Sequence, residues 1–255
     1  MIFVIGGNGF VGSGFVRHLR TQEVPVTVVD RTNYEHLRGA ECDVLINANG
    51  NSKKNFSKND PKGDFQASVS SVRDSLVDFK FKKYVFLSSG DVYPNCSKLN
   101  FTREDSILNP AEQSPYGFHK YLAELCVQHA AKDWLIFRGN GFVGQGMKKN
   151  SVFDVLYGEK LWVHPDSRFQ FINTDDSARL VMELLNRGFS NHVFNLTATG
   201  TISVHEMMLL AGRSIPYDPT MKPVYCELST EKASQHLFLP STFETIQKFF
   251  MNNQK

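Results

Sequence analysis

The stretch VIGGNGFVG, residues 4–12, decides the fold that we expect for this chain. It overlaps an apolar run at 2–5 and leads into an amphipathic segment at 10–20, which predicts a strand, a tight turn and a helix in that order. Glycines at positions 6, 9 and 12 suit a tight turn, close approach of the backbone to a pyrophosphate, and close packing of helix on strand. The N–H groups at the start of that helix would face the phosphates. An ordinary glycine-rich turn is the alternative.

A second apolar run, residues 26–30, ends in Asp30, where an acid can bind both ribose hydroxyls of NAD. The loop and this acid together predict dinucleotide binding. Arg31 could accept the 2′-phosphate of NADP, but Asp30 would repel that phosphate, so we favour NAD and leave NADP open. The cofactor contacts predicted at this end of the chain are Gly6, Asn8, Gly9, Phe10, Val11, Gly12, Asp30 and Arg31.

The rest of the chain continues the alternation of strand and helix. The expected strands are 43–48, 83–89, 134–138 and 192–196. The expected helices are 65–79, 115–131 and 174–186. This order predicts an α/β fold with a Rossmann-like, doubly wound parallel sheet. We assign residues 1–139 to a dinucleotide-binding domain, and residues 140–255 to a segment that completes the sheet and forms a small C-terminal substrate lobe. The basic, polar segment 51–60 is expected to be a solvated loop at the rim of the site, with a lid over a diphosphate as the alternative.

Composition narrows the classes of function. The chain has 255 residues, is 41% hydrophobic and carries a formal net charge of +2, which is too small to indicate nucleic acid or a membrane surface. No stretch is long and apolar enough to span a membrane, so we expect a cytoplasmic protein. The four cysteines show no C-x-x-C spacing and are expected to be reduced thiols. Because no H-E-x-x-H pattern occurs, we expect no metal site.

The stretch SPYGFHKYLAE, residues 114–124, places Tyr116 and Lys120 on one face of a helix. Ser114 suits the N-cap and Pro115 the first helical position. Tyr116 then lies in the first turn, where the helix dipole favours a tyrosinate. A free phenol has a pKa of about 10, and a nearby ammonium and an oxidised nicotinamide would lower it. A pair of exposed helix residues is the alternative.

The stretch FLSSGDVYP, residues 86–94, places Ser88 and Ser89 at the carboxyl end of an expected strand. Open parallel sheets bind their ligands at that end, and a serine there can donate a hydrogen bond to a substrate oxygen. Combined with the dinucleotide loop, these serines make a catalytic role for Tyr116 and Lys120 the better interpretation.

The chain resembles the extended short-chain dehydrogenase/reductases, also called the NAD-dependent epimerase/dehydratase family, from Met1 to about Leu196. The motifs that carry the resemblance are GGNGFVG, VVDR, DVLINA, YVFLSSGDVYP, SPYGFHKYLAE, FRGNGFVG and FINTDDSARLV. The resemblance implies a triad of Ser89, Tyr116 and Lys120. Tyr116 would be the acid/base for a sugar hydroxyl or ketone, and Lys120 would bind the nicotinamide ribose and lower the tyrosine pKa. Sugar nucleotides are the commonest substrates of this family.

Further cofactor contacts are expected at Ala48 and Asn49, which follow the DVLIN run, and at Tyr116 and Lys120 themselves. We also expect a homodimer. Lys148, Lys149, Arg168 and Arg213, in the segments of the small lobe, are candidates for contacts with substrate phosphates.

Three departures from the family pattern are informative. Ser68 stands where the family usually has an Asn facing the catalytic Lys, which puts a water or proton relay there in doubt. Only twelve residues separate Asp30 from Asp43, so the sheet should lack an edge strand that most members have, as in the 4-keto reductases of deoxysugar nucleotide synthesis. Asp91 occupies the position of the glutamate base of 4,6-dehydratases, but its neighbour Gly90 supplies no acid partner; a loop-capping carboxylate is the alternative.

Three functions follow as hypotheses. The first is reduction of a 4-keto sugar nucleotide by NAD(P)H, with release of the oxidised cofactor. The second is an epimerase or 4,6-dehydratase that retains its NAD through the turnover. The third, disfavoured by the intact triad, is a non-catalytic dinucleotide-binding subunit.

Overall fold

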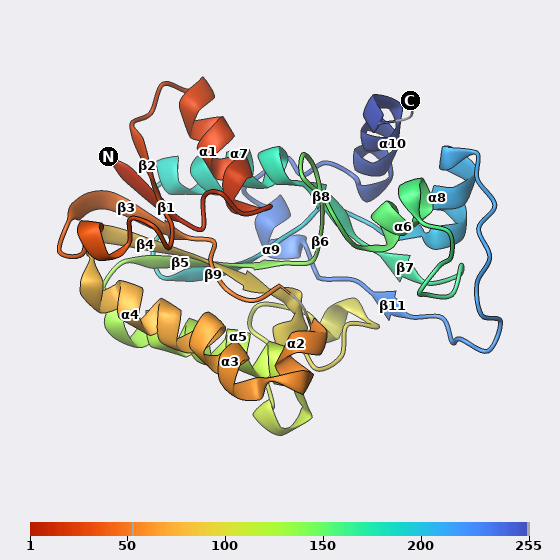
Figure 1. Ribbon diagram of the computed structural model, residues 1–255, viewed down its shortest axis with the longest axis horizontal. Helices are drawn as coiled ribbons and strands as arrows, with labels where there is room; N and C mark the ends of the chain where they lie inside the picture. Colours follow the sequence, from red (N-terminus) through yellow and green to blue (C-terminus); the bar gives the residue numbers. More distant parts are fainter. Residues whose placement is uncertain (53, 254–255) are drawn as a thin grey trace.

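A single parallel sheet forms the centre of the molecule (Figure 1). The structure, a computed structural model, describes residues 1–52 and 54–253. Within these residues the sheet has six strands, all pairs parallel, in the spatial order β2 (Val26–Val29), β1 (Ile2–Ile5), β3 (Glu41–Asn47), β4 (Lys80–Ser89), β5 (Trp134–Gly139) and β9 (His192–Leu196). The predicted α/β, Rossmann-like fold is confirmed.

Helices cover both faces of this sheet (Figure 1). On one face lie α1 (Gly12–Thr21) and α7 (Thr174–Asn186), and on the other lie α3 (Pro61–Phe65), the π-helical turn η2 (Gln66–Ser70), α4 (Ser71–Asp78) and α5 (Pro115–Ala130). Strands that are covered on both faces read as continuous apolar runs rather than as alternating ones. The four residues of β1 are accordingly all buried.

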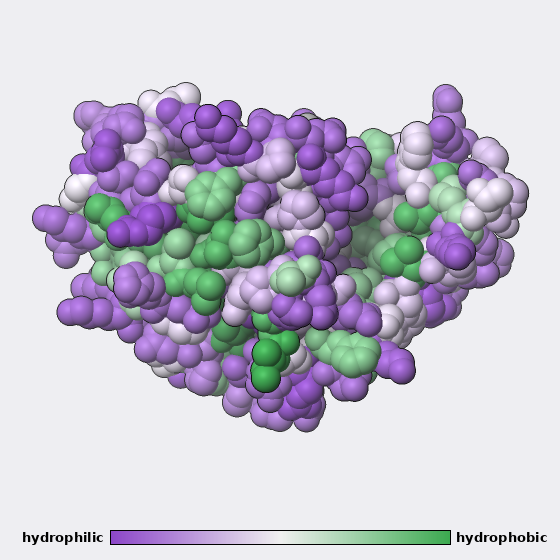
Figure 2. All heavy atoms as spheres, turned by 90° about the horizontal axis from the view of Figure 1, so that it is seen from below, coloured by the Kyte–Doolittle hydropathy of each residue, from purple (hydrophilic) through white to green (hydrophobic). Residues whose placement is uncertain are grey.

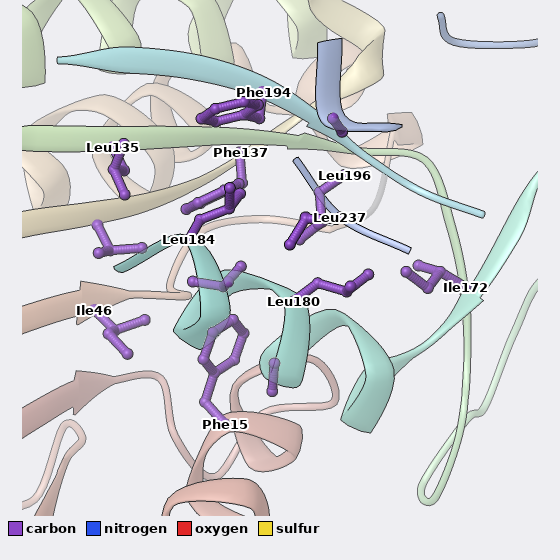
Figure 3. Close-up of a cluster of buried hydrophobic side chains, with 14 of the residues drawn as sticks. Phe15, Ile46, Leu135, Phe137, Ile172, Leu180, Leu184, Phe194, Leu196 and Leu237 are labelled. Atoms are coloured by element: carbon purple, nitrogen blue, oxygen red, sulfur yellow. The ribbon is translucent and has the colours of Figure 1, made fainter. Parts of the chain in front are cut away.

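The core between the sheet and α1 and α7 is built from aliphatic and aromatic side chains (Figure 3). Phe15 of α1 and Leu184 of α7 point toward Ile46 and Phe137 of the sheet. Each such side chain contributes about 1.5–3 kcal/mol when it is fully removed from water. This burial holds the glycine loop, which joins β1 to α1, in a fixed position over the sheet.

The connection from β2 to β3 is a short crossover, as the sequence predicted. It contains the 3-10 turn η1 (Glu35–Leu37) and no α-helix, and β2 is the edge strand of the sheet. The additional edge strand is therefore lacking, which confirms that prediction. Asp78, at the end of α4, stabilises the crossover. Its carboxylate accepts hydrogen bonds from Tyr34 Oη (3.1 Å) and Arg38 Nη2 (2.8 Å).

The back of the chain forms a small lobe beyond the carboxyl ends of the strands (Figure 1). Its elements are β6 (Gly141–Val143), paired with β8 (Phe171–Asn173); β7 (Arg168–Phe169), paired with β10 (Ile202–Ser203) and β11 (Tyr225–Cys226); and α6 (Ser151–Tyr157), α8 (Val204–Ala211) and α10 (Thr242–Asn253). The short helix α9 (Glu231–Ser234) packs on β9 instead, and its Ala233 belongs to the core of the sheet. The lobe has its own core, which includes Leu161, Met207 and Phe250. The assignment of residues 1–139 and 140–255 to separate roles stays a prediction.

The segment 51–60, expected to be a loop, contains the helix α2 (Lys54–Asn59); Lys53 lies outside the described residues. Six residues, of which only Phe56 is apolar, give too short a stretch for helical periodicity to be visible. The boundary that follows is local: Asp60 precedes Pro61, leaves helical geometry (φ −136°) and caps α3 by accepting a hydrogen bond from Gly63 N. The remaining short turns are η3 (Gly90–Val92), η4 (Leu99–Phe101) and η5 (Pro110–Glu112).

The expectation of four reduced cysteines is wrong for two of them. Cys96 and Cys226 form a disulfide across a sequence separation of 130 residues, whereas Cys42 and Cys126 are free. The two come together because the segment after η3 runs beside β11, where Glu227 N donates to the carbonyl oxygen of Cys96 (2.8 Å). Nothing in the spacing of the cysteines announces this pairing. No described helix is both long and apolar enough to cross a bilayer.

Candidate active site

A groove of about 1550 Å³ runs along the carboxyl ends of β1, β2 and β3. It collects many of the predicted cofactor contacts, namely Gly6, Asn8, Gly9, Asp30, Arg31 and Asn49. Phe10, Val11, Gly12 and Ala48 lie outside its lining. The four predicted catalytic side chains also lie outside its lining; they belong to the carboxyl end of β4, to the turn that follows it and to α5.

The glycine loop needs its glycines for steric reasons. Gly6 has a φ of +75°, and a Cβ there would lie 3.1 Å from the carbonyl group of Ala48 and the nitrogen of Asn49. A Cβ on Gly12 would overlap the carbonyl oxygen of Gly6. Ala48 therefore supports the loop from behind. A cradle that side chains would fill, at the start of a helix, fits the pyrophosphate of a dinucleotide.

Asp30 is held in place by its neighbours at the mouth of the groove. Its carboxylate accepts hydrogen bonds from Asn8 Nδ2 (2.7 Å), Thr32 N (2.8 Å) and Thr32 Oγ1 (2.6 Å). The hydrogen bond from the Thr32 hydroxyl is the largest of several that lower the pKa of Asp30. The groove thus presents a fixed negative charge, while Arg31 beside it is exposed.

Tyr116 and Ser89 come together where β4 ends and α5 begins. Ser89 is the last residue of β4, and Ser114 caps α5 by accepting a hydrogen bond from Gly117 N (3.1 Å). Tyr116 is buried, and burial together with the Asp91 carboxylate raises the pKa of its phenol, while a hydrogen bond with Ser89 opposes the rise.

The sequence led us to expect a lowered pKa for Tyr116 from the nearby ammonium. Lys120 is not among the groups that shift the pKa of this phenol, and burial dominates instead. The ammonium is itself buried and donates its hydrogen bond to the backbone. The further lowering by an oxidised nicotinamide stays a prediction.

Asp91 lies at the centre of a small polar cluster. Its Oδ2 accepts a hydrogen bond from Ser89 Oγ (3.0 Å), and its N–H donates back to the same hydroxyl (3.2 Å). Its Oδ1 lies 2.6 Å from Lys54 Nζ, on α2. The Ser89 hydroxyl therefore contacts both Asp91 and Tyr116. Sequence reasoning missed Lys54, whose only signal was its place beyond the carboxyl end of β3.

Two glycines set how closely η3 approaches its neighbours. A Cβ on Gly117 would overlap the carbonyl oxygen of Asp91, so the backbones of α5 and η3 touch there. A Cβ on Gly90 would lie 2.8 Å from the Leu228 side chain. A side chain at position 90 would therefore require the Leu228 side chain to move.

Lys120 lies one turn after Tyr116, behind the wall of the groove. Its Nζ donates to the carbonyl oxygen of Leu87 (3.3 Å) and lies 5.2 Å from the centre of the Phe86 ring. A Cβ at Gly50, which lines the groove, would be only 3.1 Å from this nitrogen. Burial lowers the pKa of Lys120 to about 8, although the carboxylates of Asp64 and Glu124 act in the opposite direction.

Ser68 is buried in the π-helical turn η2. Its hydroxyl accepts a hydrogen bond from Asn51 N (3.3 Å) and donates to Asp64 Oδ1 (3.2 Å). A water or proton relay through this position stays an untested hypothesis.

The cations expected on the substrate side divide into two groups. Arg213 donates to the carbonyl oxygen of Val155 (2.8 Å), and Arg168 Nη1 lies 3.1 Å from a carboxylate oxygen of Glu206. These contacts stabilise the lobe itself. Lys148 is exposed, and Lys149 donates to the carbonyl oxygen of Ser52, across from the lobe.

The face that carries α2 to α5 is hollowed between the main body and the small lobe (Figure 2). A second cavity, of about 500 Å³, lies at the amino ends of β5 and β9, near Trp134 and His192. It is at the opposite end of the sheet from the ligand-binding end. Among residues 1–52 and 54–253, no three His, Cys, Asp or Glu side chains gather in a way that could hold a metal ion.

Comparison with known proteins agrees with this geometry. The model of a family described as the NAD dependent epimerase/dehydratase family matches residues 2–197. A dTDP-4-dehydrorhamnose reductase from Clostridium acetobutylicum is 19% identical, with a TM-score of 0.83 over 100% of this chain and 99% of that one.

Two further solved structures are similar over nearly their full length. A UDP-galactose 4-epimerase is 18% identical, with a TM-score of 0.81 over 98% of this chain and 97% of the other. MoeE5 in complex with UDP-glucuronic acid and NAD is also 18% identical, with a TM-score of 0.80 over 98% and 99%. At such identities these three structures establish the fold.

Proposed function

Since the chain belongs to the NAD-dependent epimerase/dehydratase family, we propose that it is an NAD(P)-dependent oxidoreductase that reduces a 4-keto sugar nucleotide. The reduced nicotinamide would supply a hydride to the ketone carbon. Tyr116 donates the proton of its Oη to the ketone oxygen, which becomes the hydroxyl of the product, and recovers a proton from solvent. Ser89 donates a hydrogen bond to the same oxygen, and Lys120 binds the nicotinamide ribose.

The observation that carries the proposal is the position of Ser89 and Tyr116 together beyond β4, with Lys120 behind the wall of the cofactor groove. A burial that raises the pKa of Tyr116 keeps the phenol protonated, and a reductase needs it in that state at the start of the reaction. The similar reductase and the complex with UDP-glucuronic acid and NAD support a sugar nucleotide as substrate.

Reduction is favoured over dehydration by the surroundings of Asp91. A dehydratase needs an acid and a base near the sugar, but position 90 is a glycine, packed against the Leu228 side chain, and supplies no second carboxyl group. Asp91 is also paired with Lys54. The short crossover between β2 and β3 supports the same choice.

The alternative is an epimerase or 4,6-dehydratase that retains NAD. It is favoured by one observation, the carboxylate of Asp91 next to Tyr116, which could act as a base if a substrate displaced Lys54. A non-catalytic dinucleotide-binding subunit would use the groove alone.

We expect NAD to be preferred to NADP because of Asp30. We also expect a homodimer and a cytoplasmic location, and both stay predictions. Apolar side chains gather on the face over α4 and α5 (Figure 2), where Val77 is 66% and Leu125 41% exposed. Surface of this kind supports self-association. Light scattering on the purified protein will measure the mass.

The test of the proposed function begins with the cofactor that the purified protein carries. We expect an empty site, which added NADH or NADPH fills, because a reductase must exchange its cofactor in every turnover. The protein should then oxidise the reduced cofactor when a dTDP- or UDP-linked 4-keto-6-deoxysugar is supplied. NAD that is released only on denaturation, in a ratio near one per chain, would support the epimerase or dehydratase instead.

A further inference from the structure

Asp64, on α3, is a carboxylate with no exposed surface, and the proposed reaction does not use it. Its Oδ2 lies 2.6 Å from His119 Nδ1, and its Oδ1 accepts hydrogen bonds from Asn51 Nδ2 (2.8 Å) and Ser68 Oγ (3.2 Å). Because an ionised carboxylate can only accept hydrogen bonds, Nδ1 of His119 carries a proton. A buried charge is stable only when it is bonded in this way.

Two of the donors to Asp64, His119 and Asn51, lie on segments next to Lys120, namely the helix α5 and the loop that follows β3. His119 precedes Lys120 on α5, so the bond to Asp64 fixes the helix at that point. Asn51 follows Gly50, the residue of the groove wall that lies against Lys120 Nζ. Asp64 thus ties the helix that bears Tyr116 and Lys120 to the loop that follows β3.

Few other charges act on Lys120. Glu124, on the same helix, is paired with Arg138 of β5 (2.8 Å). Strand β4 faces the ammonium with the Leu87 carbonyl group and the Phe86 ring. The η3 carboxylate is already paired with the ammonium of α2.

Of the two carboxylates that act on Lys120, that of Glu124 is paired with Arg138, whereas that of Asp64 contacts the ring of His119. The Asp64 carboxylate raises the pKa of Lys120 against the effect of burial.

We propose that Asp64 is a positioning residue for Lys120. It anchors both α5 and the loop that follows β3, and it supplies the negative charge that keeps the Lys120 side chain protonated beside the cofactor groove. The inference rests on the proposed function, in which Lys120 binds the nicotinamide ribose. Burial alone favours the neutral amine, so loss of this carboxylate leaves an amine with one donor fewer for the ribose hydroxyls.

The variant Asp64→Asn isolates the charge. An asparagine has the same shape; its Oδ1 can accept from Asn51 and Ser68, and its amide can donate to the other tautomer of His119, so the fold should persist. Asp60→Asn is the matched control, because Asp60 directly precedes the same short helix, is exposed and caps it, and an asparagine caps equally well.

The first readout is the titration of Lys120 by NMR of ¹³C-labelled lysine, with the signal assigned through Lys120→Met. We expect the midpoint in Asp64→Asn to fall by about one pH unit, as is typical for loss of a nearby opposite charge, and that in Asp60→Asn to stay unchanged. We also expect Asp64→Asn to bind NADH roughly tenfold more weakly, as loss of a charged hydrogen bond implies. Coinciding midpoints for Asp64→Asn and the unmodified protein would overturn the proposal.

A second variant, His119→Gln, keeps the carboxylate and loosens the anchor. Lys120 should then titrate as in the unmodified protein, while NADH binds more weakly. A midpoint that moves as far as in Asp64→Asn, or an unchanged NADH affinity, would contradict the proposal. The NMR titration needs no substrate: a protein that binds neither NADH nor NADPH refutes the proposed function, while the role of Asp64 is still decided by the midpoint.

Discussion

Burial acts in opposite directions on the two acid–base residues of the site. It raises the pKa of the Tyr116 phenol and lowers that of the Lys120 amine to about 8. Both shifts favour the uncharged form of a group held away from water. The charge on Lys120 therefore depends on the carboxylates around it, of which Asp64 opposes the effect of burial most strongly.

Lys120 should reduce the stability of the protein that it serves. A lysine with a folded pKa of about 8 and an unfolded value near 10.5 binds its proton less tightly when folded, so the buried ammonium destabilises the fold below pH 8. Stability should rise from pH 8 to about 10.5, where the unfolded chain binds more protons. We expect Lys120→Met to raise the free energy of unfolding at pH 7 by up to about 3 kcal/mol, less about 1 kcal/mol for the lost hydrogen bond to Leu87.

Denaturant unfolding at several pH values measures this effect. Lys132→Met, which removes an exposed lysine just after α5, is the control and should change stability by less than about 0.5 kcal/mol. A Lys120→Met protein less stable than the unmodified one, or one that keeps the rise above pH 8, would contradict the assignment.

Asp30 and Arg31 should divide the preference between the two cofactors. The fixed carboxylate of Asp30 can accept the ribose hydroxyls of NAD and repels a 2′-phosphate. We expect Asp30→Ala to weaken NAD binding by about 10- to 100-fold, as for loss of a charged hydrogen bond, and to strengthen NADP binding. Arg31→Ala should weaken NADP more than NAD. Titration of both cofactors into these proteins tests the two roles, and Asp43→Ala, at the far end of β3, is the control. A clear preference of the unmodified protein for NADP would contradict this role of Asp30.

At the residue scale, the sequence predicted which residues form the candidate site better than it predicted their burial and their contacts. Tyr116, Lys120 and Ser89 could be predicted because helix spacing and strand ends place them together. Their burial could not, because it depends on α3 and η2, which cover the site from another part of the chain. Asp64 and Lys54 were missed because neither belongs to a periodic pattern.

At the scale of elements, the strands and the long helices were predictable, since each combines apolar periodicity with a recognisable end. The helix α2 was not, because it is six residues long with a single apolar one, and its boundary depends on Asp60 and Pro61. The contact of η3 with α5 was also invisible, although Gly117 makes it possible. Short elements that fix a site obtain their geometry from tertiary packing, which local propensity does not report.

The disulfide joins two segments whose proximity no sequence pattern predicts. Cys96 follows η3, and Cys226 is in β11 of the small lobe, so the bond ties the segment after β4 to the lobe. A cross-link over so long a loop typically stabilises a fold by about 2–4 kcal/mol. We expect Cys96→Ser to lower the free energy of unfolding by that amount, whereas Cys126→Ser, which removes a free thiol, should have a small effect.

Thiol titration of the unfolded protein gives an independent check. Two thiols should react without reductant and four after reduction. Four reactive thiols in the unreduced protein would show that the two cysteines do not pair in solution.

At the scale of the whole molecule, the cofactor groove belongs to the sheet, whereas the lobe is expected to cover the substrate. The carboxyl ends of the strands point toward the lobe (Figure 1), so the cofactor groove and the polar cluster of Ser89 and Asp91 lie on the side where the lobe can enclose a substrate. The sequence predicted this arrangement in outline. It could not predict which lobe cations stay free, because Arg168 and Arg213 are engaged in contacts within the lobe.

The central claim is that Tyr116 transfers the proton in reduction of a 4-keto sugar nucleotide. Turnover of such a substrate by Tyr116→Phe tests it most directly, with NADH affinity measured alongside and Tyr121→Phe, on the same helix, as control. The ring remains and only the transferable proton is lost, so we predict a fall in kcat of about 10²- to 10⁴-fold, with NADH affinity unchanged and Tyr121→Phe near normal. A Tyr116→Phe protein that turns over its substrate at close to the unmodified rate would contradict the account.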